Sequence, residues 1–380
     1  MIKVKSESLS THFMISGFAT PNGTKNFVQS LGGVHDNYNL VQNLTLSNVG
    51  IGTYLGNPDS QTDLLVTDAV KKSILAGINV IDTAINYRAQ KAERSVGKAV
   101  SELIAEGKIT RDQVFISTKN GYVTNDADIK EEFWSYIQRE YAKPGVIGPN
   151  DISSGYHCMT IKYLDDQLAR SLKNLGLDCV DLMYLHNAVE GQIQDISKEQ
   201  FIKNLKDVFE FYEQKRKEGK IRYYGMATWE CFRVPKENPQ YLSLYDVVQI
   251  AKQVGGEDHG FRFIQLPYNL HYDQAYMLKN QQANGTDMSI LDAAQTCGIG
   301  VFTSVPLMQG RLLAPGVLPG FGNLKPSHQC MQFIRSTPGV VAPLVGQKTP
   351  SHVDENLEIM KITPMNKDEF EGLVKKLVSS

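Results

Sequence analysis

Hydrophobic residues along the chain fall into two kinds of run. Short runs rich in Val, Ile, Tyr and Phe, without polar alternation, are typical of parallel strands covered on both faces. They predict eight strands, near residues 48–54, 79–84, 114–119, 179–186, 223–228, 263–269, 300–305 and 343–348. Longer segments with apolar residues three or four apart predict the helices between them. These helices are expected near residues 62–76, 91–106, 161–175, 198–218, 242–254, 288–297, 327–336 and 350–361.

This alternation predicts an α/β fold. Eight strands that are each followed by a helix make up a (β/α)8 TIM barrel. A doubly wound open sheet gives the same alternation but usually has only about five or six strands. Such a sheet would also carry a dinucleotide fingerprint, and the nearest approach, at Gly50–Gly56, has one residue too many. We therefore expect residues 1–380 to form a single barrel domain.

The N-terminal extension, residues 1–47, lies outside this repeat. Apolar and polar residues alternate through residues 39–54, which predicts a hairpin leading into the first barrel strand. Its turn is expected at Ser47-Asn48, a pair of residues common in turns. A hairpin at this point would cap the bottom of the barrel.

The second segment outside the repeat is an insertion, residues 120–160, after the third strand. An amphipathic helix is predicted within it by apolar residues at helical spacing, namely Ile129, Phe133, Trp134 and Ile137. The C-terminal ends of barrel strands form the catalytic face, so we expect the insertion to line or cover the substrate. Trp134, and Asn187 at the end of the fourth strand, are the candidate substrate contacts.

Charge and composition exclude several classes of protein. Lys and Arg number 39 against 41 Asp and Glu, a net charge of −2, which argues against nucleic-acid or membrane-surface binding. With 42% hydrophobic and 21% charged residues, the chain is not of a disordered type. No apolar stretch approaches the roughly 18 residues of a membrane span. Residues 1–10 lack the apolar core of a signal peptide, so a cytoplasmic protein is expected.

Neither a disulfide framework nor a metal site is expected. The five cysteines, at 158, 179, 231, 297 and 330, form no CxxC pair. Histidines and carboxylates show no HExxH or similar metal-ligand spacing.

Polar residues stand at the C-terminal ends of three neighbouring predicted strands. Asp82 and Tyr87 follow the second strand, Lys119 ends the third and His186 ends the fourth. Each residue alone fits packing or capping, but together they reach one rim of the barrel. An ammonium lowers the pKa of a nearby phenol, a carboxylate holds the ammonium, and an imidazole orients a substrate oxygen. This set can protonate the alkoxide that forms when hydride attacks a carbonyl.

Several segments, in the same order along the chain, resemble the aldo-keto reductase superfamily. They are Gly50–Tyr54, Asp82–Tyr87, Glu93–Gly97, Ser117–Lys119, Asp181–Asn187, Gln265–Asn269, Pro306–Gly310 and Gly346–Asn356. The resemblance implies an NADPH-dependent barrel whose catalytic residues are Asp82, Tyr87, Lys119 and His186. It makes Tyr87 the general acid, tuned by Lys119 and Asp82, and makes His186 the residue that orients the carbonyl.

The last strand and helix lead to the cofactor hypothesis. Gly346–Asn356 predicts a strand end, a turn and a helix with Pro350 in its first turn, and such an N-terminus beside Lys348 suits a phosphate. The resemblance implies that the adenosine 2′-phosphate binds there, which favours NADP over NAD. The cofactor residues it implies are Gly52, Thr53, Tyr54, Thr228, Gln265, Ser304, Pro306, Leu307, Gln309, Gly310, Gly346, Lys348, Thr349, His352, Glu355 and Asn356.

The chain departs from the family pattern around the cofactor. Ala227-Thr228 stands where a serine–asparagine pair usually holds the nicotinamide amide, and Ser304 stands where a tyrosine often stacks under the ring. His352 replaces the usual arginine or glutamine. Arg88 replaces the glycine that usually follows the catalytic tyrosine.

Three functions remain open from the sequence. The first is NADPH-dependent reduction of a small aldehyde or ketone. The second is a sensor or regulatory subunit on the same barrel, similar to the potassium-channel β-subunits, which keep the same four residues. The third is a lyase or isomerase that uses Lys119 as a Schiff-base amine.

Overall fold

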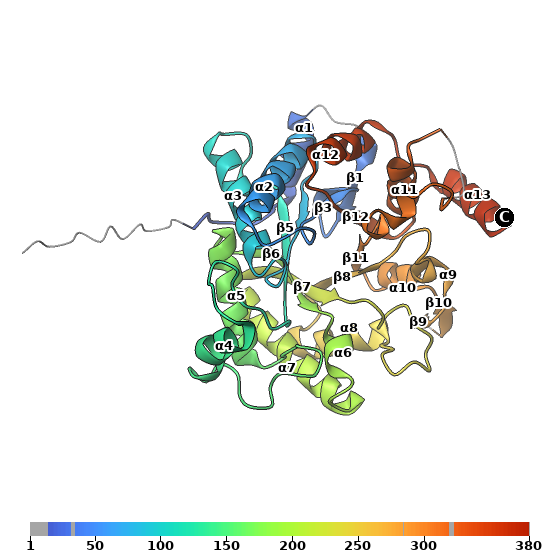
Figure 1. The fold of residues 1–380 in the computed structure, drawn as a ribbon. Coiled ribbons are helices and arrows are strands. Elements are labelled where there is room, and N and C mark those ends of the chain that lie inside the picture. Colours follow the sequence, from blue (N-terminus) through green and yellow to red (C-terminus); the bar gives the residue numbers. More distant parts are fainter. Residues whose placement is uncertain (1–13, 32–34, 284, 319–322, 380) are drawn as a thin grey trace, which may run out of the picture.

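The barrel strands surround a common axis. The computed structural model describes residues 14–31, 35–283, 285–318 and 323–379. Eight parallel strands close into a barrel in the order β11-β12-β3-β4-β5-β6-β7-β8, which confirms the predicted TIM barrel (Figure 1). These strands are β3 (Gly50–Gly52), β4 (Val80–Asp82), β5 (Phe115–Asn120), β6 (Val180–His186), β7 (Ile221–Ala227), β8 (Phe261–Pro267), β11 (Gly300–Ser304) and β12 (Val340–Gly346).

The helices that follow these strands pack around the outside of the barrel (Figure 1). They are α2 (Ser60–Leu75), α3 (Lys91–Ala105), α5 (Ile161–Leu175), α7 (Lys198–Lys217), α8 (Leu244–Gly255), α10 (Ile290–Thr296), α11 (Pro326–Arg335) and α12 (Pro350–Leu357). Several start where a side chain accepts a hydrogen bond from the first turn, as Asp59 does for α2 and Ser197 for α7. Across the described ranges, no helix is both long and apolar enough to span a membrane.

Several elements lie outside the predicted repeat. Those that are helical or extended are α1 (Pro21–Ser30), α6 (Ala188–Gln192), α9 (Gln274–Met277), the ribbon of β9 (Gln281–Ala283) and β10 (Thr286–Met288), and α13 (Lys367–Val378). Short 3-10 turns occupy His35–Asn37, Arg111–Gln113, Met308–Leu313 and Glu358–Lys361. None of these elements contributes a strand to the barrel.

The barrel interior changes from apolar to polar along its axis. The rings of Phe115, Phe263 and Phe302 meet inside it, with centroids 5.4 to 6.0 Å apart. Side chains of a strand alternate between faces, so Ser117 and Lys119 point the same way as Phe115 but lie nearer the C-terminal end. The polar layer therefore sits on an apolar floor at the catalytic face.

The N-terminal hairpin is present, but its turn is not where the sequence pattern put it. Strands β1 (Tyr38–Val41) and β2 (Leu44–Ser47) pair antiparallel around Gln42 and Asn43. Both turn residues are left-handed, with φ of 49° and 64°, as two-residue hairpin turns require. The predicted turn at Ser47-Asn48 is wrong, because Ser47 is extended and pairs with Tyr38.

The hairpin closes the N-terminal end of the barrel, as expected. Leu44 and Leu46 are buried in the same cluster as Phe115 and the other inward-facing side chains. Asn79, just before β4, donates from Nδ2 to the Thr45 carbonyl at 2.9 Å. Apolar contacts and hydrogen bonds together hold the hairpin against the end of the barrel.

The insertion after β5 carries a shorter helix than the spacing predicts. Helix α4 covers Phe133–Ile137 and continues as a π-helical turn over Gln138–Ala142, while Ile129 lies before it. The insertion has its own small core, made of Val123, Tyr136, Ile137, Tyr141, Ile147, Cys158 and Tyr163. Because Tyr163 belongs to α5, this core joins the insertion to the barrel's outer layer.

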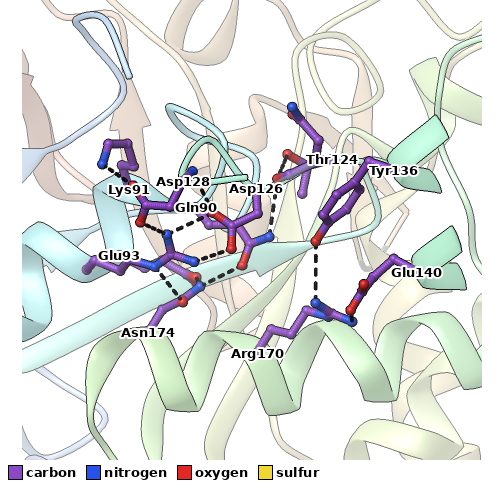
Figure 2. A network of polar contacts seen from close by, with 12 residues as sticks. Gln90, Lys91, Glu93, Thr124, Asp126, Asp128, Tyr136, Glu140, Arg170 and Asn174 are labelled. Carbon is purple, nitrogen blue, oxygen red and sulfur yellow. Dashed lines mark hydrogen bonds and ion pairs between the residues drawn. The ribbon is translucent and has the colours of Figure 1, made fainter. Parts of the chain in front are cut away.

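Ion pairs fasten the insertion to the neighbouring helices (Figure 2). Arg94 of α3 pairs with Asp126 and Asp128 near the start of the insertion. Arg170 of α5 pairs with Glu140 at 3.0 Å, beyond α4. These ion pairs attach the first half of the insertion to α3 near its start and to α5 near its end.

Candidate active site

A cavity of about 640 Å³ opens at the C-terminal ends of the strands. It extends from Tyr87 and His186 to Asn356 on α12. The four predicted catalytic residues come together at one end, although Lys119 lies just beneath the lining. All the predicted cofactor residues line the cavity except Lys348 and Thr349.

Asp82 and Lys119 form a buried ion pair below the cavity. Lys119 is 0% exposed, and its Nζ donates to Asp82 Oδ2 at 2.5 Å and to the Thr83 carbonyl at 2.8 Å. Ser117 Oγ and Gln265 Nε2 donate to the other carboxylate oxygen, at 2.8 and 3.0 Å. Burial lowers the pKa of Lys119, and Asp82 opposes that shift. A buried pair stays charged only when its hydrogen-bonding capacity is filled in this way.

Tyr87 is half-buried at the inner end of the cavity. Lys119 Nζ lies 4.7 Å from the centroid of its ring, and the Tyr54 ring packs edge-on at 5.0 Å. Burial first, and then the charge of Asp82, raise the pKa of Tyr87 well above 10. The expected net lowering of this pKa is therefore wrong for this structure, because loss of hydration and the charge of Asp82 both raise it. The phenol keeps its proton and is able to donate it.

The loop that carries Tyr87 has an unusual backbone. Arg88, Ala89 and Gln90 are consecutive left-handed residues, with φ of 50°, 49° and 76°. Glycine is favoured at such positions, which explains why a glycine is usual where this chain has Arg88. The Arg88 guanidinium offsets the strain by binding Ser95 Oγ at 2.8 Å and lying 3.1 Å from an Asp63 oxygen.

His186 lies at the same end of the cavity as Tyr87 and is a neutral imidazole. This end is called the reacting end below, after the chemistry predicted for it. Its ring meets Tyr87 edge-on at 5.8 Å and Tyr122 at 5.0 Å. Burial first, and then the charge of Lys119, hold the pKa of His186 well below 6.5. Among the described residues, its Nδ1 has no hydrogen-bond partner. A neutral histidine retains one N–H, which is what orienting a carbonyl oxygen requires.

The structure places Trp134, a predicted substrate contact, away from the cavity. Trp134 is 47% exposed, stacks on Tyr156 at 5.7 Å and is not among the residues that line the cavity. The small core beneath α4 faces α5, which turns Trp134 toward solvent. Tyr122, only three residues after Lys119, lines the cavity instead. Its position just beyond a catalytic strand end was the available signal.

Asn187 lines the cavity as expected, together with residues that the sequence did not single out. Asn187 is left-handed, with φ of 46°, and its Nδ2 donates to Tyr122 Oη at 3.2 Å. Asn86 and Trp229 also line this end. The lining near Tyr87 and His186 thus includes aromatic rings and neutral amides.

The α12 end of the cavity is where the adenosine 2′-phosphate is predicted to bind. His352 is exposed, while Glu355 accepts from Ser327 Oγ at 2.6 Å. Lys348 lies in the turn before α12, and within the described ranges it makes no hydrogen bond or ion pair. Its side chain lies against Gly56, where an added Cβ would stand 3.0 Å from Lys348 Cε. Among the described residues, no side chain caps the start of α12, so its first backbone N–H groups suit an anionic group such as a dinucleotide phosphate.

Comparison with known proteins identifies the family. The model of the Aldo/keto reductase family matches residues 48–315. The chain belongs to this family. It is 23% identical over 335 residues to the oxidoreductase YqkF of Bacillus subtilis, covering 87% of this chain and 92% of that protein. It is 28% identical over 211 residues to the NADH-specific methylglyoxal reductase of Escherichia coli, covering 54% of this chain and 55% of the relative.

Solved structures show the same fold. An aldo/keto reductase from Klebsiella pneumoniae in complex with NADP and acetate aligns with a TM-score of 0.58 and 19% identity, over 90% of this chain and 96% of that one. The holo form of an aldo-keto reductase from Bacillus halodurans aligns with a TM-score of 0.58 and 20% identity, over 90% and 96% of the two chains.

The structure gives a reason for one departure from the family pattern. Thr228 stands where the family usually has asparagine, and its Oγ1 donates to Glu190 Oε1 at 2.6 Å. The same carboxylate oxygen accepts from the backbone N–H groups of Trp229 and Glu230, at 2.8 and 2.6 Å. Glu190 therefore anchors the loop after β7, and Thr228 contributes to that anchor.

Proposed function

We propose that this aldo/keto reductase uses NADPH to reduce an aldehyde or ketone to an alcohol, with Tyr87 as the proton donor. The observation that carries the proposal is the arrangement at the inner end of the cavity. A protonated Tyr87 lies there beside the buried Asp82–Lys119 pair and a neutral His186. Bound nicotinamide would supply the hydride for the carbonyl carbon.

The side chains of the protein orient the substrate, donate the proton and stabilise the charge that results. His186 orients the carbonyl oxygen toward the phenol of Tyr87 by donating a hydrogen bond from its neutral ring. Tyr87 gives its proton to that oxygen as negative charge develops. Lys119, 4.7 Å from the ring centroid, stabilises the phenolate that results, and Asp82 keeps the ammonium in place. This role for Lys119 concerns the product of proton transfer and agrees with the high pKa of the resting phenol.

We further propose that the substrate is small and uncharged. Among the described residues, neither lysine nor arginine lines the Tyr87 end of the cavity, and Lys119 beneath it is paired with Asp82, so a phosphate or carboxylate on the substrate would find no free cationic partner at this end. Tyr54, Tyr122 and Trp229 provide apolar faces, and Asn86 and Asn187 provide amides. This wall suits a neutral oxo-aldehyde or hydroxy-aldehyde. The similarity to a methylglyoxal reductase supports the same class.

For the cofactor we propose NADPH over NADH. Support comes from Lys348, which has no ion-pair partner among the described residues and precedes the first turn of α12. The Klebsiella pneumoniae structure contains NADP, whereas the Escherichia coli relative is described as NADH-specific. The choice between the two therefore depends on the side chains before and within α12.

A two-step experiment tests the proposed function. Fluorescence titration with NADPH and NADH measures cofactor binding, and the absorbance of the reduced cofactor is then followed with methylglyoxal, glyceraldehyde and glyceraldehyde 3-phosphate. We expect tighter binding of NADPH and turnover of the two uncharged aldehydes. Binding without turnover of any carbonyl would favour the sensor function. Borohydride trapping of a substrate on Lys119 would favour the Schiff-base function, which the ion pair with Asp82 disfavours.

A further inference from the structure

A second histidine lies directly behind the catalytic rim. His157 belongs to the insertion after β5, is 0% exposed, and forms an isolated antiparallel bridge with Tyr122. Its Nε2 lies 2.9 Å from the backbone carbonyl oxygen of His186. Its Nδ1 lies 3.1 Å from Nε2 of Gln192, on α6. The imidazole therefore connects the insertion, the end of β6 and α6.

The hydrogen bonds define the protonation of His157. Gln192 Nε2 also lies 3.2 Å from the His157 carbonyl oxygen, which can only accept, so this atom of Gln192 is the donating amide nitrogen. His157 Nδ1 must then accept, and Nε2 carries the proton that is donated to the His186 carbonyl. Burial lowers the pKa of His157 to about 4, in agreement with a neutral ring.

Two glycines make room for this imidazole. A Cβ added to Gly121 would stand 2.4 Å from His157 Nε2, and one added to Gly191 would stand 2.6 Å from His157 Cβ. Contacts below about 3 Å would force the ring to move, so both positions accept glycine only. Gly121 also has a left-handed φ of 117°. The two glycines thus leave a space between the end of β5 and α6 that the His157 side chain fills.

The group that His157 holds belongs to the reacting end of the cavity. The His186 carbonyl precedes Asn187, whose left-handed φ of 46° directs its amide to Tyr122 Oη. The Tyr122 ring packs edge-on against His157 at 5.5 Å and against His186 at 5.0 Å. A movement of His157 would therefore shift Tyr122, Asn187 and the His186 backbone together.

We propose that His157 is a positioning residue that sets the carbonyl-binding geometry of His186, Asn187 and Tyr122. It is not among the residues that line the cavity, and it acts through the His186 carbonyl and the Tyr122 ring. This role rests on the proposed reductase function. It also assigns a role to the insertion, because residues 120–160 contain both Tyr122, which lines the cavity, and His157, which packs against it.

Two substitutions separate the donated hydrogen bond from the filled space. His157→Gln keeps an N–H donor at about the reach of Nε2, whereas His157→Leu keeps bulk and removes the donor. His259→Leu is the matched control, because His259 is a buried neutral histidine in the loop before β8, at the opposite end of the barrel. We expect kcat/KM for methylglyoxal to fall about 10-fold or more in His157→Leu and to recover to within about 3-fold of the parent in His157→Gln.

Cofactor binding and a magnetic resonance signature complete the test. The Kd for NADPH should stay within about 2-fold of the parent in all three variants, since none of the changes touches the α12 end. In the parent, the 15N-labelled imidazole signal that disappears in His157→Gln should show a protonated Nε2 and should not titrate between about pH 5.5 and pH 8. This second readout applies even if His157→Leu fails to fold.

Each contrary outcome has a distinct meaning. Equal kcat/KM in parent, His157→Leu and His157→Gln would overturn the positioning role while leaving the reductase function intact. A protonated Nδ1, or an equal loss of activity in His259→Leu, would overturn it as well. A parent that turns over no carbonyl compound while binding NADPH would refute the proposed function and this role with it.

Discussion

The two ends of the cavity differ in how their side chains are held. At the Tyr87 end, Lys119 and Asp82 are buried and bonded to each other, and Asp82 also accepts from Ser117 on β5 and Gln265 on β8. At the α12 end, His352 is exposed and Lys348 has no ion-pair partner among the described residues. The Tyr87 end is organised before anything binds, whereas Lys348 and His352 at the α12 end are free to adjust to a bound phosphate.

This difference follows from where the residues stand in the barrel. Asp82, Lys119 and His186 lie on strands that hydrogen-bond to each other, so their relative positions follow from the closed sheet. Lys348 lies in a turn, where the backbone sets only a direction and the long side chain sets the rest. Single substitutions at the Tyr87 end should therefore change kcat, whereas single substitutions at the α12 end should change the preference for NADPH or NADH.

Removal of Lys119 should give the largest effect of the substitutions that test this contrast. Lys119→Met leaves Asp82 buried without its partner and deprives the Tyr87 phenolate of a nearby charge. We expect kcat to fall about 10²–10⁴-fold with little change in the Kd for NADPH. Lys91→Met is the matched control, because Lys91 pairs with Asp63 and Asp128 away from the cavity. A similar loss in both variants would assign the effect to stability.

Substitution of Lys348 should weaken the preference for NADPH over NADH without changing kcat. A charge-assisted contact with the 2′-phosphate is worth about 1.5–3 kcal/mol, or roughly 10- to 150-fold in affinity. We expect Lys348→Met to weaken NADPH by about that factor, to leave NADH nearly unchanged, and to retain kcat at saturation. Titration with both cofactors measures this. Equal weakening of the two would mean that Lys348 does not contact the 2′-phosphate.

Substitutions of Trp134 and Tyr122 test which of these two residues of the insertion contacts the substrate. Tyr122 lines the cavity, whereas Trp134 stacks on Tyr156 at the surface. We expect Tyr122→Leu to raise KM for aldehydes about 10-fold and Trp134→Ala to change kcat/KM less than about 2-fold. Steady-state kinetics with several carbonyl compounds decide the point. A large effect of Trp134→Ala would restore Trp134 as a substrate contact.

The smallest effect on kcat is expected from a change of pH. The pKa of His186 lies well below 6.5, so this residue becomes charged only in acid, and the pKa of Tyr87 lies well above 10, so its proton is lost only in strong base. Both groups are then in their reactive form between about pH 5.5 and about pH 9, and kcat for reduction should be flat there. A titration of kcat near neutral pH would show that one of the two shifts is wrong.

The features that sequence predicted best are those set by the sheet. The eight strands and their helices were predicted within a few residues, and Asp82, Lys119 and His186 met at one rim because parallel strand ends must meet. The hairpin turn was misplaced because Gln42-Asn43 is a less common left-handed pair than Asn-Gly.

Loop side chains were predicted less well. Trp134 turns outward because the small core beneath α4 fixes its helix, and that core involves Tyr163 of α5, distant in sequence. The direction of the Tyr87 pKa shift was also missed. It depends on burial, which spacing along the chain does not measure.

The most direct test of the account is the behaviour of Tyr87→Phe in a single turnover. Phenylalanine keeps the ring and its packing but removes the proton that the proposed reaction delivers to the carbonyl oxygen. With NADPH bound and methylglyoxal in excess, we expect an unchanged Kd for NADPH and a rate at least about 100-fold below the parent. If the variant binds NADPH normally and retains more than about a tenth of the parental rate, Tyr87 is not the proton donor.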